Sequence, residues 1–422
     1  MIGLMSLTRR QAVAGALAAS SSAVPSRAAK TAYAAKPRTG PSMEDLARVA
    51  AQPVLKRDGF ATPVIIQSVE LLKLDKDYLV RVRSTDGAEG ISVCNPPRAD
   101  YLDRILKNLV APAFLKKDAR DLDDLLWQAY RHDDNYKLYG IALWSPLAWV
   151  EMAVLDMLGH IANKSIGQLL GDVRRKDIAV YVASGRRDTT PSQEIEYLQS
   201  LVEQSKAKAL KFRLGGRMSR NADAMPGRTD TLIPLVRKTF GDDFDLHGDS
   251  NSSYDPAHAI PIGRKLEEYG YVYYEEPCEF DALEDTKKVR DTLSIPVALG
   301  EQEYSEWRFR WCIANNVCDI VQPDLFYYGG LIRSLRVSRM AELAKKPTTV
   351  HISGGFGFVY MLHFASVVKE IGKYQEYKLG MDKYGKWFDP PISVANGHMS
   401  VPTGPGVGIK DPGALVKSAQ PA

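Results

Sequence analysis

The sequence has 422 residues, of which 45% are hydrophobic and 25% are charged, a globular composition and a length suited to about two domains. The formal net charge is +4, but residues 1–28 carry three basic and no acidic side chains, so the remainder carries only +1. This near-neutral balance argues against a nucleic-acid-binding surface, and we expect no nucleic-acid partner.

Residues 1–28 resemble a twin-arginine export signal peptide. Arg9 and Arg10 precede a mildly apolar run over residues 12–19, and Ser26-Arg27-Ala28 offers small residues for cleavage. A disordered alanine-rich tail is the alternative. The run is much shorter than the roughly 20 residues of a membrane-spanning helix, and no later run is expected to come closer. We therefore predict a soluble protein, periplasmic or secreted, with no membrane partner.

Residues 29–60 are rich in Ala, Lys and Pro and are interpreted as a linker. Three strands are then expected within 62–74, 77–87 and 89–93, with a turn at Asp86-Gly87. Helical patterns follow over 100–114, 121–130 and 145–172. Together these elements predict a small α+β domain over residues 61–172.

After residue 172 short apolar strands alternate with helical segments, which predicts parallel βαβ units. The eight expected strands are 178–184, 209–213, 243–249, 271–277, 295–301, 319–324, 348–353 and 373–377. Eight such strands fit a modified TIM barrel of the (β/α)7β type over residues 173–378. The Gly- and Pro-rich segment 379–422 is expected to return to the first domain and complete it. Four cysteines match no metal-binding spacing, so buried free thiols are favoured, although an exported chain can pair them.

The residues that end successive barrel strands recur at a regular interval. They are Asp249, Glu275, Glu301, Asp324, His351 and Glu376, separated by 26, 26, 23, 27 and 25 residues. Because the carboxyl ends of barrel strands meet at one mouth, these side chains are expected to converge. Three carboxylates in register predict one Mg²⁺ per subunit, held by Asp249, Glu275 and Glu301. The alternative is that they are surface acids that cap helices.

The motifs at these positions resemble those of the enolase superfamily, in its mandelate racemase and muconate-lactonizing branch, over about residues 60–410. "GDSN", "YEEP" and "LGEQ" are similar to the three metal-ligand motifs, "QPDLFYYGG" with "VHIS" to the Asp/His pair, and "YQEY" to the last strand. The resemblance implies that Asp324 and His351 form a catalytic dyad. It also implies that Glu376 hydrogen-bonds the substrate carboxylate.

One stretch departs from the family pattern. Where the family has Lys-x-Lys on the second strand, this sequence has Lys211 and Arg213. Arginine does not lose its proton at working pH, so the face opposite His351 lacks the usual second base. We expect both side chains to take part in catalysis and in substrate binding.

The predicted chemistry is removal of the proton α to a carboxylate. His351 is the expected base, because imidazole titrates near neutral pH, and Asp324 is expected to orient it. Mg²⁺ and Lys211 would stabilise the enediolate. A single base favours dehydration of a sugar acid, as in sugar-acid dehydratases of the mandelate racemase type. A racemase or epimerase, and a carboxylate-binding protein without turnover, remain alternatives.

Substrate contacts are predicted from three regions. At the strand ends we expect Asn251 beside Lys211, Arg213 and Glu376. The first domain is expected to add Asn95 and Tyr136 from its polar loops. The loop over 214–229 is interpreted as a lid or specificity loop, or else as a surface excursion. The family resemblance also implies a homo-oligomer.

Overall fold

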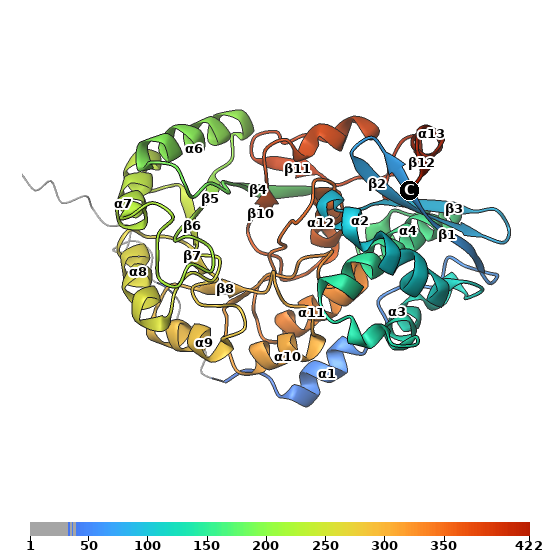
Figure 1. Ribbon diagram of the computed structural model, residues 1–422, viewed down its shortest axis with the longest axis horizontal. Helices are drawn as coiled ribbons and strands as arrows, with labels where there is room; N and C mark the ends of the chain where they lie inside the picture. Colours follow the sequence, from blue (N-terminus) through green and yellow to red (C-terminus); the bar gives the residue numbers. More distant parts are fainter. Residues whose placement is uncertain (1–32, 34–35, 37–38) are drawn as a thin grey trace, which may run out of the picture.

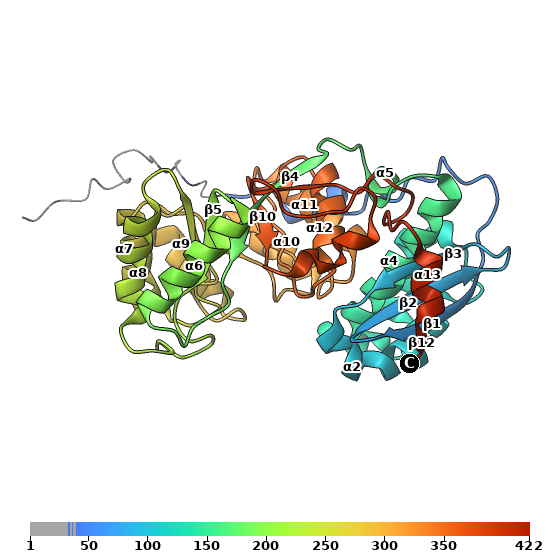
Figure 2. The ribbon, with the colours of Figure 1, turned by 90° about the horizontal axis from the view of Figure 1, so that it is seen from above.

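The computed structural model describes residues 33, 36 and 39–422. A barrel with helices around it lies beside a smaller α+β domain, which we call the cap (Figure 1, Figure 2). The predicted export signal, residues 1–28, lies outside the described residues. The predicted fold class, a modified TIM barrel with an N-terminal α+β domain, is confirmed by the topology that follows.

An antiparallel sheet forms one layer of the cap. Its strands are β1 (Ile66–Leu74), β2 (Asp77–Ser84) and β3 (Glu89–Val93), with the C-terminal β12 (Gln420–Pro421) beside β1. The predicted turn joins β2 to β3, and Gly87 adopts a φ of 91° there, which glycine tolerates without a steric penalty. Helix α4 (Ile141–Ala162) packs on β2 and β3 and so covers one face of the sheet.

The remaining cap helices are short. They are α2 (Pro96–Ile105), α3 (Leu122–Arg131) and α5 (Ile166–Leu170), with single turns η2 (Leu106–Val110), η3 (Ala111–Phe114), η4 (Ala119–Asp121) and η5 (Asn135–Lys137). By contrast, α4 has 22 residues and is apolar enough to cross a membrane by length and composition. The expectation that no later run comes closer to a spanning helix is therefore wrong. Since 89% of its most apolar window is buried inside the protein, α4 has the burial of a core helix.

One acid in α4 links the cap to the barrel. Glu151 accepts the N–H groups of Leu331 and Ile332 at 2.8 and 2.7 Å, at the start of α11 (Leu331–Leu343). Gly330, which precedes α11, has a φ of 107°, and a side chain there would collide with the Glu151 carboxylate. Burial raises the pKa of Glu151 from 4.5 to about 8.

The barrel strands are parallel and follow chain order around the sheet. They are β4 (Asp177–Ala183), β5 (Ala209–Arg213), β6 (Asp245–Asp249), β7 (Tyr273–Glu275), β8 (Val297–Leu299), β9 (Ile320–Val321) and β10 (Gln375–Tyr377). The helices between them are α6 (Pro191–Ser205), α7 (Arg228–Phe240), α8 (Pro256–Glu268), α9 (Leu283–Thr292), α10 (Glu306–Ala314), α11 and α12 (Gly357–Val367). Pairing of β10 with β4 closes the circle.

The predicted strand over 348–353 is present only as isolated bridges. Thr348 pairs with Val321 on one side and with Ile371 on the other, and Asp324 pairs with His351. On the β10 side, the side chain of Gln375 accepts the N–H of Val350 and that of Glu376 accepts the N–H of Ile352, both at 2.9 Å. Side chains thus replace part of the backbone ladder, and the segment still places His351 at the mouth.

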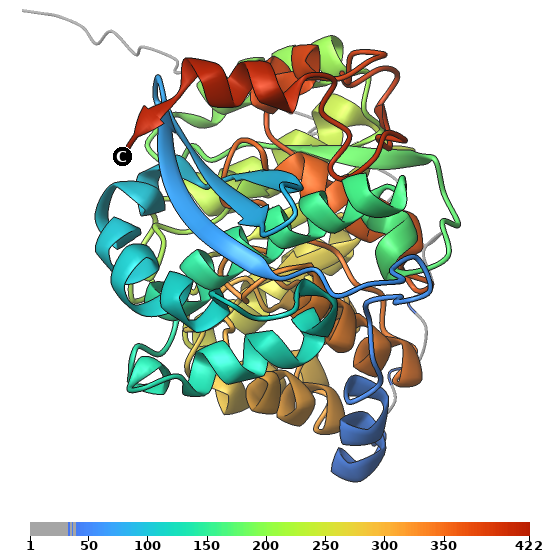
Figure 3. The ribbon, with the colours of Figure 1, turned by 90° about the vertical axis from the view of Figure 1, so that its right-hand side faces the viewer.

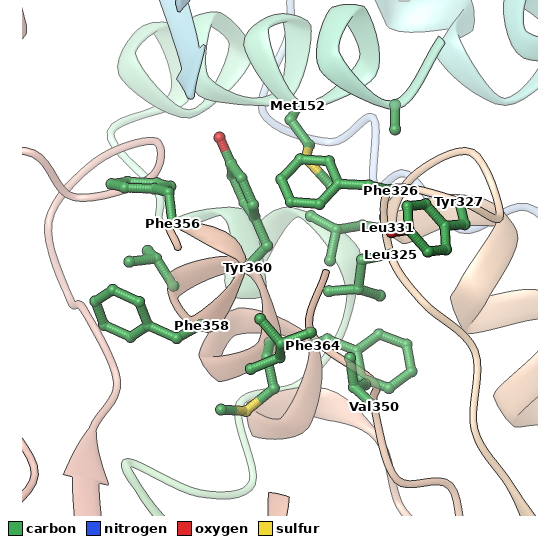
Figure 4. Close-up of a cluster of buried hydrophobic side chains, with 14 of the residues drawn as sticks. Met152, Leu325, Phe326, Tyr327, Leu331, Val350, Phe356, Phe358, Tyr360 and Phe364 are labelled. Atoms are coloured by element: carbon green, nitrogen blue, oxygen red, sulfur yellow. The ribbon is translucent and has the colours of Figure 1, made fainter. Parts of the chain in front are cut away.

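Apolar packing joins α4 to the barrel (Figure 4). Met152 of α4, Leu331 of α11 and Tyr360 of α12 are fully buried in this cluster. The hydroxyl of Tyr360 also accepts the N–H of Val93, the last residue of β3, at 3.0 Å. Because cores of this kind are close-packed, the cap is held at a fixed position beside the barrel mouth.

The segment predicted as a linker, 29–60, contains a helix, so that prediction needs a correction. Helix α1 (Met43–Ala50) packs on α10 and α11, with Leu46 and Ala50 buried. The side chain of Ser42 accepts the N–H of Asp45 at 3.0 Å, which is a standard N-cap. One apolar face of only two turns is a weak sequence signal, and the Ala- and Pro-rich surroundings obscured it.

The C-terminal segment returns to the cap, as predicted. After η6 (Met381–Trp387), β11 (His398–Ser400) pairs with β4 of the barrel. Helix α13 (Pro412–Ser418) and β12 then lie against β1, and Leu72 pairs with Pro421. Figure 3 shows this red segment at the edge of the blue cap sheet. All four cysteines are buried and free.

Candidate active site

A carboxylate ends or follows each of three neighbouring strands. Asp249 is the last residue of β6 and pairs in register with Glu275, the last residue of β7. Glu301 follows β8, the next strand in the sheet. One carboxylate oxygen from each lies within 4.8 Å of the others, and all three side chains are buried. The structure therefore brings the three predicted metal ligands together, and we call them the carboxylate cage.

The cage has the composition of a site for a hard divalent cation. Three buried carboxylates at this separation repel one another unless positive charge lies among them. Glu301 Oε2 is buried without a hydrogen-bond donor in the part of the chain that the structure describes. An all-oxygen donor set with three negative charges fits a cation such as Mg²⁺.

Lys211 lies at the centre of the barrel mouth. Its Nζ is 2.7 Å from Glu275 Oε1, 3.2 Å from Glu376 Oε1 and 3.4 Å from Asp249 Oδ2. Burial lowers the pKa of Lys211, but Glu275 and Glu376 outweigh burial and hold that pKa well above its usual value. Lys211 is therefore a permanent cation here, suited to stabilising negative charge and unsuited to accepting a proton.

The neighbouring wall of the mouth is formed around Asn251. Arg213, at the end of β5, forms an ion pair with Asp249. Asn251 donates from Nδ2 to Glu276 Oε2 at 3.2 Å, and its Oδ1 accepts from Arg187. Burial and the adjacent carboxylates raise the pKa of Glu276 well above its usual value. Arg187 was not predicted from the sequence, because the first barrel strand ends without an acid that marks the mouth.

His351 and Asp324 form a hydrogen-bonded pair. His351 Nδ1 lies 2.8 Å from Asp324 Oδ2, and Asp324 Oδ1 accepts the N–H groups of Phe326 and Tyr327 at 2.8 and 2.9 Å. A proton on Nδ1 satisfies Asp324 and leaves the lone pair of Nε2 free. Nε2 lies 3.5 Å from Glu301 Oε2, so it faces the cage.

Glu376, on the last strand, is held on both oxygens. Its Oε2 accepts the N–H of Ile352 at 2.9 Å and lies 3.3 Å from Lys378 Nζ, and its Oε1 contacts Lys211. Burial alone would raise the pKa of Glu376, but Lys211, Lys378 and His351 hold it well below its usual value. Glu376 is therefore a carboxylate beside His351 and can accept a hydrogen bond from a ligand.

A cavity of about 480 Å³ lies at this mouth, and of the groups above it is lined by Arg213, Asn251, Glu276, Glu301, His351 and Lys378. The cap contributes Arg98 and Ile141 to the wall, and the loop over 214–229 contributes Arg217 and Met218. That loop is fixed by backbone hydrogen bonds to the segment after β6, for example from Met218 N–H to Asn251 O at 3.0 Å. The loop therefore lines the pocket, and the surface-excursion alternative is wrong.

Two predicted substrate contacts do not reach this cavity. Asn95 is fully buried, and its Oδ1 accepts a hydrogen bond from Trp149 Nε1 at 2.9 Å. Tyr136 is 47% exposed, and Lys137 Nζ lies over its ring. Both predictions came from loop polarity, which does not determine the direction of a side chain. Arg98, three residues after Asn95 in the first turn of α2, lines the wall.

Gln322 supports the cage and was not predicted. Its Nε2 donates to Glu275 Oε2 at 3.0 Å, so both oxygens of Glu275 have fixed positions. The sequence feature that could have identified Gln322 is its position two residues before Asp324, at the end of the same strand. Ser353, two residues after His351, similarly donates to Asp324 Oδ1 at 3.0 Å.

A barrel with acids on successive strand ends and a His–Asp pair beside them has the arrangement of an enzyme active site at the barrel mouth. Two family profiles match the chain: mandelate racemase / muconate lactonizing enzyme, N-terminal domain, over residues 62–171, and enolase C-terminal domain-like over residues 193–411. The chain belongs to the mandelate racemase and muconate-lactonizing branch of the enolase superfamily.

Similar proteins include enzymes and solved structures. The chain is 28% identical over 312 residues to arabinonate dehydratase of Saccharolobus solfataricus, covering 74% of this chain and 81% of the relative. It is 26% identical to L-talarate/galactarate dehydratase of Salmonella typhimurium over 65% and 67% of the two chains. A solved structure from Roseobacter denitrificans, provisionally assigned as a racemase, is 34% identical with a TM-score of 0.77, covering 84% and 98%.

Proposed function

We propose that this enzyme is a Mg²⁺-dependent dehydratase of sugar acids that removes the α-proton with His351. The observation that carries the proposal is the pair described above: Asp324 fixes Nδ1, and Nε2 faces the carboxylate cage. The dehydratase names of the curated relatives support the reaction class.

The chemistry follows from the positions of these groups. The substrate carboxylate binds on the pocket side of the cage, near Lys211, with its α-proton toward His351 Nε2. Nε2 takes the proton, and the electron pair of the C–H bond moves toward the carboxylate. A Mg²⁺ ion held by the cage would supply positive charge next to that carboxylate, and Lys211 adds its own.

The second half of the reaction expels the β-hydroxyl. The electron pair returns from the carboxylate to form a carbon–carbon double bond, the carbon–oxygen bond breaks, and the protonated His351 returns its proton to the leaving oxygen. Water is lost, and the resulting enol becomes a 2-keto-3-deoxy acid. One base therefore suffices. Lys211 and Arg213, at the positions where the family has its second base motif, both keep their protons and therefore do not serve as a second base.

Racemisation is the second candidate, and it is favoured by the Roseobacter denitrificans protein at 34% identity. Inversion needs a proton donor on each face of the α-carbon, whereas dehydration needs one. The test is a screen of sugar acids with Mg²⁺ for loss of water, together with NMR of α-proton exchange in deuterated water. Exchange of both enantiomers of a slow substrate at similar rates would reject the dehydratase assignment in favour of a racemase.

We also propose that the enzyme is exported through the twin-arginine pathway, on the evidence of Arg9 and Arg10. Export in a folded state would allow the cage to take up its metal in the cytoplasm. Replacing both residues by lysine should leave the precursor in the cytoplasm, as measured by cell fractionation. Unchanged secretion of the double variant would reject this route.

A further inference from the structure

Two arginines line one wall of the pocket, and a third lies next to that wall. Arg213 ends β5, Arg217 follows in the loop after it, and Arg187 comes from the loop after β4. Arg213 and Arg217 line the cavity. Arg187 is tied to this wall through Asn251, which also lines the cavity: Arg187 donates to Asn251 Oδ1, and Met218, next to Arg217, donates its N–H to Asn251 O at 3.0 Å. Burial, followed by the charges of Arg213 and Arg217, lowers the pKa of Arg187 to about 9.

This cluster has too little negative charge around it. Arg187 donates to Asn251 Oδ1 and to the carbonyl of Gly185, both of which are uncharged. The Nε atoms of Arg187 and Arg213 are buried without a hydrogen-bond partner among the described residues. No ion pair involves Arg217 within residues 39–422, and only its backbone N–H is bonded, to Ser253 Oγ at 3.0 Å.

Among the residues that the structure describes, one carboxylate is paired with the cluster, and it already has another role. Asp249 pairs with Arg213 but also belongs to the cage. A divalent cation in the cage would add positive charge beside the arginines and balance none of theirs. Of the three arginines only Arg213 is buried, whereas Arg187 is half-buried and Arg217 is exposed. Guanidinium groups that share one committed carboxylate favour an anion that arrives with the ligand.

We propose that Arg187 and Arg217 bind a second anionic group of the substrate, so that the preferred substrate is a dicarboxylic sugar acid. The proposal rests on the proposed function, in which a first carboxylate binds at the cage. The planar guanidinium fork matches a carboxylate with two parallel hydrogen bonds. Arg213, between the cage and Arg187, neutralises the part of the ligand that links the two ends.

The other cations of the pocket already have partners. Arg98 donates to the hydroxyls of Tyr101 and Tyr327, both at 2.9 Å. Lys378 lies 3.3 Å from Glu376 Oε2. Lys378 therefore has a carboxylate partner, whereas Arg98 is bonded, among the described residues, only to uncharged hydroxyls and is the alternative anchor for a second anion.

Binding of unreactive acids tests this without turnover. Adipate and hexanoate both have six carbons, and only adipate has a second carboxylate. Calorimetric titration of the Mg²⁺-loaded enzyme should show adipate binding at least about ten-fold more tightly, because hydrogen bonds between charged groups are strong. Equal affinities would overturn the proposal.

Variants locate the second subsite. Arg217→Met, at an exposed loop position, should remove about ten-fold from the preference for adipate and leave hexanoate affinity unchanged. Arg187→Lys should have a similar effect, because it keeps the charge and loses the fork. Arg220→Met is the matched control, since Arg220 is exposed on the same loop and has a similar φ, 52° against 61° for Arg217. If Arg98→Met loses the preference for adipate over hexanoate while Arg187→Lys and Arg217→Met keep it, the second anion does not bind at Arg187 and Arg217.

Turnover distinguishes this inference from the proposed function. A six-carbon aldarate should be dehydrated with a higher kcat/KM than the aldonate with the same hydroxyl configuration. A higher value for the aldonate, or for its 6-phosphate, would reject the dicarboxylate. If no acid is dehydrated while adipate keeps its advantage, the dehydratase assignment fails and the second anion subsite stands.

Discussion

Replacing Asp324 by asparagine tests whether this carboxylate sets the tautomer of His351. Because Oδ1 accepts the N–H groups of Phe326 and Tyr327, the amide oxygen of Asp324→Asn would take that position. The amide nitrogen would then replace Oδ2, facing His351 Nδ1, which lies 2.8 Å from Oδ2 in the wild type. An amide nitrogen only donates, so Nδ1 would become the acceptor and the imidazole proton would move to Nε2, where a base is required.

The size of the loss follows from the cost of restoring the productive tautomer. A proton on Nδ1 would then place two donors face to face and leave both without an acceptor. Each buried, unsatisfied donor costs about 1–3 kcal/mol. Two of them cost about 2–6 kcal/mol, which corresponds to a rate loss of about 30-fold to 20,000-fold at about 1.4 kcal/mol per tenfold.

The assay is the rate of α-proton exchange and kcat/KM, with Mg²⁺ affinity measured by calorimetry as a check on the cage. His351→Asn removes the base and should lose several orders of magnitude while binding metal normally. Ser353→Ala is the control, because it removes one hydroxyl from Asp324 Oδ1 and leaves both backbone donors; its loss should stay below about ten-fold. An Asp324→Asn enzyme that keeps more than a tenth of wild-type exchange would refute the tautomer argument.

Glu275→Gln removes one negative charge from the cage, so Mg²⁺ affinity should fall at least about 100-fold and α-proton exchange should stop. A calorimetric titration that gives the wild-type Mg²⁺ affinity would reject the cage as the metal site. Arg213→Lys should introduce slow exchange of the opposite-hand α-proton, observed by NMR in deuterated water, and its absence in a variant with normal metal binding would show that the opposite face is shielded. Because the pKa of Glu151 rises from 4.5 to about 8 on folding, the folded state binds more protons than the unfolded chain between those values. Stability should therefore fall as pH rises through this window. Thermal melting of Glu151→Gln should show a smaller fall in stability over this pH range than the wild type. Parallel pH profiles of the wild type and the variant would contradict the raised pKa of Glu151.

The strand ends were predictable from the sequence because the barrel repeats. One strand and one helix occupy a nearly constant length of chain, so residues at equal intervals reach the same edge of the sheet. Asp249 and Glu275 pair in register as this argument requires. The argument from equal spacing does not apply outside the repeat. Helix α1 lies before the barrel, and Asn95 and Tyr136 belong to the cap, at the N-cap of α2 and in η5. A fully buried Asn95 is bonded to Trp149, a contact that no local pattern encodes.

Register shows which residues meet, but it does not show which atoms meet. From the sequence, Asp324 is a partner that orients His351, and replacing it by asparagine should cost less than deleting the base. The structure shows that two backbone N–H groups fix one oxygen of Asp324, so the substituted amide cannot rotate to offer its oxygen to the imidazole. The variant then holds the base in the wrong tautomer in addition to losing the negative charge. The loss in Asp324→Asn should therefore approach that of His351→Asn, and the ratio of the two rates measures how firmly the backbone after β9 holds the carboxylate.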